Sequence, residues 1–159
     1  MSVPTHPAAI EWLAQTSVAH AFNEADPWIF AGVMSLHLLS LALAFGTSLI
    51  LDLRLVGIGL RASPAADIAR YLQPYLLAAL SIALLSGLWL FTADVLKFWS
   101  NPAFKTKLVL LIIITVAQTW LLRRAKNGGA AAVAARPVAA LTVLTWLAAI
   151  IAGRLIGLI

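Results

Sequence analysis

Four long apolar runs constrain this chain more than any other feature of its sequence. They extend over Trp28–Leu51, Tyr71–Leu96, Lys107–Leu122 and Pro137–Ile159. An α-helix needs about 20 mostly apolar residues to cross a hydrocarbon core about 30 Å thick, so the runs predict membrane-spanning helices, the third being the shortest. Because the runs are continuous and lack the alternation of a transmembrane strand, they exclude a β-barrel. The sequence therefore predicts an all-α fold, a bundle of four transmembrane helices.

Composition agrees with a membrane protein. The chain is 62% hydrophobic and 11% charged, with a mean hydropathy of +0.97, whereas soluble domains are about half apolar and a quarter charged. We expect one transmembrane domain over residues 28–159, preceded by a segment over residues 1–27. In that segment Ala9–Phe22 mixes apolar and polar residues, which predicts a helix lying on the membrane surface. The segment lacks the features of a signal peptide, so we expect it to be retained.

The positive charges predict how the spans are oriented. Seven cations lie between spans one and two and between spans three and four: Arg54, Arg61, Arg70, Arg123, Arg124, Lys126 and Arg136. The loop between spans two and three has three, Lys97, Lys105 and Lys107, and no Lys or Arg precedes the first span. Cytoplasmic loops carry the excess of Lys and Arg. The predicted location is the inner membrane of a bacterium, with both termini on the periplasmic side.

Several function classes are poorly supported. There is no Cys, which excludes disulfides and thiol chemistry. The sequence shows no catalytic triad, no carboxylate pair and no His-rich metal motif, and it does not decide whether the protein is an enzyme. The net charge of +5 lies in the loops without interleaved aromatic residues, so nucleic acid is not an expected partner.

His37 is the one histidine inside a predicted span. At about 100° per residue, it shares a helix face with small and polar side chains, namely Ser40, Ala44, Thr47, Ser48 and Asp52. A polar face is costly against lipid, so we expect this face to point into the bundle. His37 follows Trp28 by about 14 Å of helical rise, which places it in the outer half of the membrane.

Three side chains are considered as companions of His37. Arg154, near the outer end of span four, lies close enough in depth to reach it, and the predicted pocket is a polar corner of His37 and Arg154. Asp94 at the outer end of span two either joins this corner or pairs with Lys97 at the interface. Gln118 lies nearer the cytoplasmic side and is a poor candidate for the same site.

Three uses of His37 remain open from the residues. Its imidazole can be an axial ligand of haem b, with Arg154 pairing a propionate. It can relay protons along the polar face, or it can be structural and fix helix register by a hydrogen bond. A six-coordinate haem needs a second ligand, and His20 could supply it by folding over from the surface helix; otherwise the haem is five-coordinate or absent. His6 also lies outside the spans, and Met34 is on the same helix as His37.

The stretches HLLSLALAFGTSLILDLRLVG, SGLWLFTADVLKFWSNPAFKTKL and TWLAAIIAGRLIGLI resemble a bacterial family of small four-helix membrane proteins catalogued as a domain of unknown function. The resemblance covers nearly the whole chain and implies architecture and a bacterial inner membrane, but no activity. The first-span histidine and the small residues after it are faintly similar to CopD-like membrane domains and to the membrane protoporphyrinogen oxidase. That similarity implies haem binding at His37.

Span four carries a stripe of small residues, Ala149, Gly153 and Gly157, which predicts close helix packing within the bundle or in a homo-oligomer or larger complex. The function hypothesis is a haem b-binding membrane subunit for electron transport. The alternative is a non-catalytic scaffold or anchor that uses the glycine stripe. A small proton-coupled transporter is a third class, disfavoured because the spans hold few ionisable groups.

Overall fold

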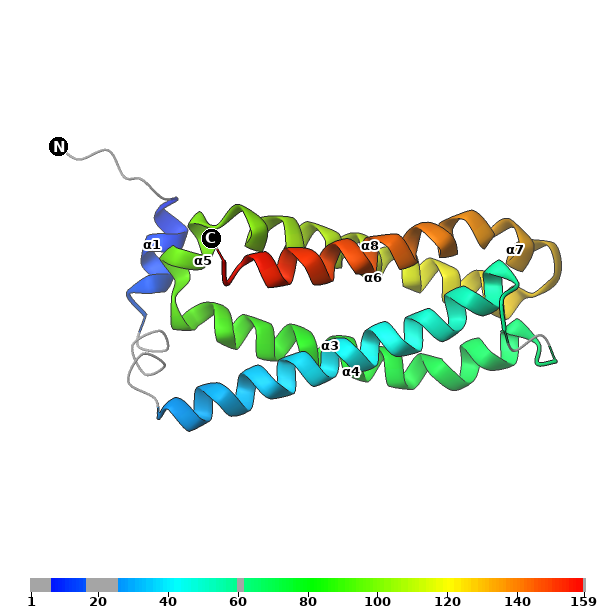
Figure 1. The fold of residues 1–159 in the computed structure, drawn as a ribbon, viewed down its shortest axis with the longest axis horizontal. Helices are drawn as coiled ribbons and strands as arrows, with labels where there is room; N and C mark the ends of the chain where they lie inside the picture. Colours follow the sequence, from blue (N-terminus) through cyan, green and yellow to red (C-terminus); the bar gives the residue numbers. More distant parts are fainter. Residues whose placement is uncertain (1–6, 17–25, 60–61, 159) are drawn as a thin grey trace.

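The computed structural model describes residues 7–16, 26–59 and 62–158, and these residues form an all-α structure (Figure 1). The helices in these ranges are α1 (Ala8–Ala14), α3 (Pro27–Val56), α4 (Ala65–Ala93), α5 (Val95–Ser100), α6 (Pro102–Asn127), α7 (Gly129–Ala134) and α8 (Arg136–Leu155). No strand occurs within them. The predicted fold class, a four-helix bundle with a short helix before it, is confirmed.

Four helices, α3, α4, α6 and α8, are long and apolar enough to cross a membrane. The 30 residues of α3 give a rise of about 45 Å, which covers the hydrocarbon core and both interfaces. Large apolar side chains such as Leu38, Leu84 and Ile112 are exposed on the outside of the bundle. Such a surface suits acyl chains and not water, so the protein is an integral membrane protein.

Three helices extend by several residues beyond the predicted runs. The first continues past Leu51 to Val56 and ends at Gly57, whose φ of 98° gives the left-handed cap that glycine adopts without strain. The second, α4, begins at Ala65 instead of Tyr71 and ends at Ala93, before the predicted end at Leu96. The third begins at Pro102, before the predicted start at Lys107. The polar flanks of α3 and α6 stay helical because these ends are capped.

Asn101 organises the end of the bundle where α5 lies. Its Oδ1 accepts hydrogen bonds from the backbone N–H groups of Ala103 at 2.9 Å and Phe104 at 3.3 Å, which caps α6. Its Nδ2 donates to the carbonyl oxygen of Ile156 at 3.3 Å, just beyond α8. One buried amide therefore joins the start of α6 to the end of α8.

The bundle core combines large and small side chains. Leu51, Leu76, Ile114 and Leu121 are fully buried. Small residues let the helices approach closely elsewhere; they include Ala44, Ala69, Ala79, Ala125 and Ala139. In this packing α3 lies against α4 and α8, and α6 lies against α8 and α4.

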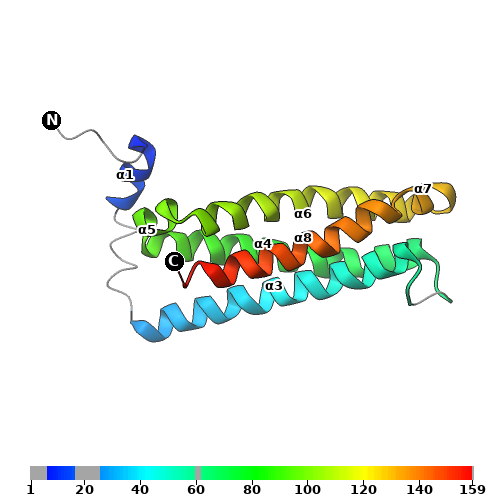
Figure 2. The ribbon, with the colours of Figure 1, turned by 45° about the horizontal axis from the view of Figure 1, so that its top comes forward.

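The end of α8 and helix α1 lie at the same end of the bundle, opposite α7 (Figure 2). Helix α1 packs against α5 there. It ends at Ala14, with Gln15 and Thr16 in a turn, so the surface helix predicted over Ala9–Phe22 is described only in its first half. The remainder of that prediction lies outside the described residues. Below, the two ends are named the α5 end and the α7 end.

Candidate functional site

His37 faces the bundle interior, as its helix face predicts. Its side chain is 8% exposed, and Ser40, Thr47, Ser48 and Asp52 on the same face are buried too. The polar face of the first span is therefore turned away from lipid. The imidazole lies against α4, where it meets the backbone and not an acidic side chain.

The hydrogen bonds of His37 fix which ring nitrogen carries the proton. Nδ1 lies 3.0 Å from the Ala83 carbonyl oxygen and 3.1 Å from Ser86 Oγ. A carbonyl oxygen only accepts, and the Ser86 hydroxyl already donates to the Ile82 carbonyl oxygen at 2.6 Å. Nδ1 therefore donates, and in the neutral ring Nε2 keeps its lone pair. Histidines that bind metals are oriented in this way.

Gly87 makes room for the ring. A Cβ atom at this position would lie 2.9 Å from His37 Cε1 and 3.4 Å from Nδ1, which is closer than a methyl group can approach. The imidazole thus packs onto bare backbone one turn after the carbonyl to which it donates. This contact explains a glycine in the middle of α4, where it would otherwise weaken the helix.

His37 lines a cavity of about 590 Å³ between α4 and α6, within the 300–1,000 Å³ typical of ligand sites. The walls are mainly leucine, isoleucine and valine, and Phe104 lies on the lining. Side chains at its edge are exposed, among them Leu84 at 63% and Val116 at 66%. The cavity therefore opens sideways to the position of the lipid acyl chains.

Lys107 is the cation at this cavity. Its side chain, half-buried, lines the cavity and also lies beside α8, since a Cβ atom on Gly153 would be 3.6 Å from Lys107 Nζ. No acidic residue is among the lining residues, and Arg70–Asp67 is the ion pair found within the described parts of the chain. The site combines an apolar wall, an imidazole and one unpaired positive charge.

The other predicted companions of His37 lie elsewhere. Arg154 is exposed and does not line the cavity, so Lys107 takes the place that the sequence assigned to it. Asp94 is exposed and accepts from the backbone N–H of Lys97 at 3.2 Å, which caps α5, in place of the predicted ion pair between the two side chains. His20 lies outside the described residues. The sequence pointed to Lys107 only as a loop charge, because its span was expected to begin there.

A second polar cluster lies nearer the α7 end. Gln118 Nε2 donates to Asp52 Oδ2 at 2.8 Å, and these side chains are 1% and 0% exposed. Asp52 Oδ1, Gln118 Oε1, Ser48 Oγ and Trp146 Nε1 are buried polar atoms without a hydrogen-bond partner. Gln118 thus belongs to a site separate from His37, as its depth predicted, and it connects α3 directly to α6.

The small-residue stripe of α8 is largely used inside the chain. Ala149 is buried in the core, and Gly153 lies against Lys107. Gly157 is exposed. An oligomer or larger complex formed through this stripe stays a prediction, with Gly157 as its one exposed member.

These features define a small four-helix integral membrane protein with a histidine at a cavity that opens to the bilayer. The chain belongs to the family described as "Family of unknown function (DUF6644)", whose model matches residues 10–159. The sequence-based assignment to an uncharacterised family is confirmed by this match. No curated protein and no solved structure matches the chain.

Proposed function

We propose that the His37 cavity binds haem b and that the protein is a membrane subunit for electron transport. The observation that carries this proposal is the donation from Nδ1 to the Ala83 carbonyl oxygen, which leaves Nε2 as an electron-pair donor beside a cavity of about 590 Å³. When bound, haem supplies one-electron redox chemistry, tuned by its axial ligand and surroundings.

The donor set supports a macrocycle more than a bare metal ion. Within the described residues, no group of three His, Cys, Asp or Glu side chains is placed to hold a metal. His37 would therefore be the single protein ligand described at the cavity, and a porphyrin brings four nitrogen donors of its own. The predicted second ligand, His20, stays a prediction, as does five-coordinate iron.

The positive charge of Lys107 also favours haem as the ligand of this cavity. An ammonium group inside a helix bundle needs an anionic or polar partner, and no acidic side chain lines this cavity. A haem propionate is such a partner, and the apolar walls suit the porphyrin face. We assign to Lys107 the propionate contact that the sequence suggested for Arg154.

The proposed location is the inner membrane of a bacterium, with the α5 end on the periplasmic side. Support comes from the charges, because seven Lys and Arg residues lie between the first and second and between the third and fourth predicted spans, against three between the second and third. The His37 cavity then lies in the outer half of the membrane, and the electron partner is expected on that side.

Absorption spectroscopy of the purified full-length protein tests the haem proposal. The expected result is a Soret band and a reduced-minus-oxidised α-band, both lost in His37→Ala and retained in the control variant His6→Ala. His20→Ala loses low-spin features if it is the second ligand. A protein that stays colourless after reconstitution with haemin, or bands unchanged in His37→Ala, would overturn the proposal.

A further inference from the structure

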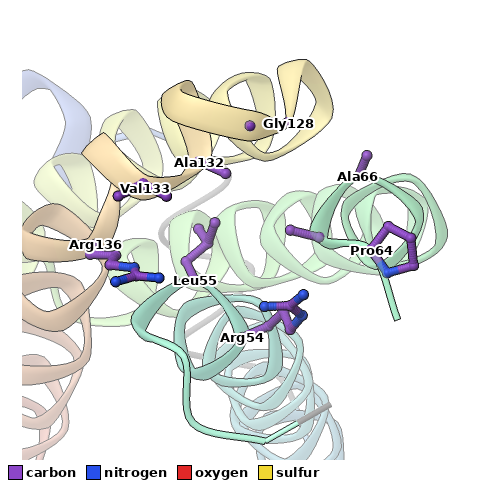
Figure 3. Close-up of a pocket in the computed structure, with 10 residues that line it drawn as sticks. Arg54, Leu55, Pro64, Ala66, Gly128, Ala132, Val133 and Arg136 are labelled. Carbon is purple, nitrogen blue, oxygen red and sulfur yellow. The ribbon is translucent and has the colours of Figure 1, made fainter. Parts of the chain in front are cut away.

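A second cavity, of about 370 Å³, lies at the α7 end of the bundle (Figure 3). Its walls come from four segments: the end of α3, the start of α4, helix α7 and the first residue of α8. None of its lining residues is acidic, and two of them, Arg54 and Arg136, are arginines. We name this cavity the arginine pocket.

Arg54 and Arg136 both line the arginine pocket, and in Figure 3 Leu55 lies between their side chains. Arg54 is half-buried, and its Nε donates to the Ser63 carbonyl oxygen at 2.9 Å, which holds the side chain in place. That bond is made by Nε and not by the two terminal nitrogens of the guanidinium. Arg136 comes from α8 and is exposed. Arginine presents paired N–H donors that match phosphate oxygens, and two such groups on one cavity favour a doubly contacted phosphate.

The start of α4 adds backbone donors to the same pocket. Pro64 is the N-cap, and no side chain caps the helix. The first two turn bonds are made by Asp67 and Ile68, so the N–H groups of Ala65 and Ala66, both on the pocket lining, precede them without an intrahelical acceptor. The start of a 29-residue helix carries partial positive charge and binds anions.

The pocket also has an apolar side, formed by Leu55, Ala132 and Val133. Val133 is 53% exposed and Leu55 is buried. Leu55 lies at the end of α3, and Ala132 and Val133 lie in α7, the short helix between α6 and α8, so the pocket is at the level where lipid headgroups meet the acyl chains. Positive pockets between helices at this level bind anionic headgroups. A ligand with a phosphate and an apolar part fits this surface better than inorganic phosphate does.

We propose that the arginine pocket binds the phosphate group of an anionic phospholipid, with Arg54 and Arg136 as its ligands and the start of α4 as a third contact. The site is separate from the His37 cavity: none of the described residues lines both cavities, and Arg54 follows His37 along α3 by about 25 Å of helical rise. The site gives Arg54 and Arg136, two of the seven cations between the predicted spans, a role besides the expected one in orienting the protein.

The test is lipid binding by the full-length protein in detergent, measured by native mass spectrometry and by the shift in melting temperature. Phosphatidylglycerol is titrated against phosphatidylcholine, and inorganic phosphate and glycerol 3-phosphate are separate arms. We expect phosphatidylglycerol to bind and stabilise the protein, and each of Arg54→Gln and Arg136→Gln to weaken it about tenfold, the usual scale for one charge-assisted contact.

The matched control is Arg123→Gln with Arg124→Gln, which removes the same charge from exposed positions that do not line the pocket. Equal losses in the control and in the double pocket variant would show general charge attraction and overturn the site. Equal stabilisation by inorganic phosphate would overturn the lipid assignment. Arg54→Gln can fail to fold because it loses the hydrogen bond to Ser63. In that case the lipid affinity of Arg136→Gln tests the site, since the Arg136 side chain is exposed.

Discussion

The two polar regions of α3 lie on one helix face but are completed in different ways. The Nδ1 atom of His37 donates a hydrogen bond to a backbone carbonyl oxygen of α4, and the ring lines a cavity that opens to lipid. Asp52, about four turns further on, is fully buried and bonded directly to Gln118 of α6. The same pattern of small and polar residues thus lines a cavity at one depth and makes a direct helix contact at the other.

A buried polar group in a membrane helix is therefore not a functional site by itself. What distinguishes His37 is the space next to it and the cation across that space. Asp52 has neither, because side chains from α6 and α8 fill its surroundings.

Gln118→Ala is expected to lower the free energy of unfolding by about 3 kcal/mol, because it leaves the Asp52 carboxyl buried without its donor. Equilibrium unfolding in mixed detergent micelles measures this change. Thr119→Ala is the control, since Thr119 is exposed and bonds its own helix at 2.8 Å. Replacing both Asp52 and Gln118 by Leu should recover most of the loss. If the free energy of unfolding is unchanged in Gln118→Ala, the hydrogen bond between Asp52 and Gln118 does not stabilise the bundle.

Gly87→Ala is expected to cost about 2 kcal/mol, because the new methyl group would displace the His37 ring or shift α4. The haem bands should weaken with it. Gly46→Ala is the matched control within α3, since a Cβ atom there meets nothing within 4 Å. That substitution should stabilise the helix slightly. Equal effects of the two variants would contradict the close contact between Gly87 and the ring.

Lys107→Met is expected to weaken haem retention about tenfold, or about 1.4 kcal/mol, because it removes the cation and keeps the length of the side chain. Arg154→Met should leave retention unchanged, since Arg154 lies outside the cavity lining. Haem transfer to apomyoglobin provides the measurement. If haem retention falls in Arg154→Met and not in Lys107→Met, the cation of the site is Arg154, as the sequence suggested.

Ser86→Ala is expected to have the smallest effect, about 0.6 kcal/mol on unfolding, which is the usual size of a side-chain hydrogen bond between membrane helices. The ring keeps its bond to the Ala83 carbonyl oxygen, so the haem spectrum should not change. Ser35→Ala, an exposed serine with a bond to its own helix, serves as the control. Complete loss of haem in Ser86→Ala would show that the hydroxyl, and not the carbonyl, orients the imidazole.

The sequence predicted the spans and the inward polar face because both depend on local patterns. The face of His37, Ser48 and Asp52 follows from helical periodicity alone, and all three side chains are buried. Helix ends were harder to predict. Asn101 and Pro102 begin α6 ahead of its apolar run, which carries Lys107 from the expected loop into the bundle.

The partner of His37 could not be predicted for a different reason. For a patterned span the sequence gives the depth of a residue and the face that turns inward, but not which side chain of a neighbouring helix that face meets. Arg154 has a suitable depth, yet it is exposed, whereas Lys107 crosses beside Gly153 to the cavity. Likewise, the partnership between Asp52 and Gln118 depends on how α3 and α6 are turned toward each other, which no spacing along the chain specifies.

The amide of Asn101 has a mechanical consequence for this bundle. Its hydrogen bonds to the start of α6 and to the residue after α8 hold these two helices together at the α5 end. The α6 side of the His37 cavity is therefore joined to α8, whereas the α4 side carries the carbonyl group and the glycine that contact the imidazole. A ligand that entered this cavity from the lipid would therefore lie between α6, which is tethered to α8, and α4, which holds the imidazole.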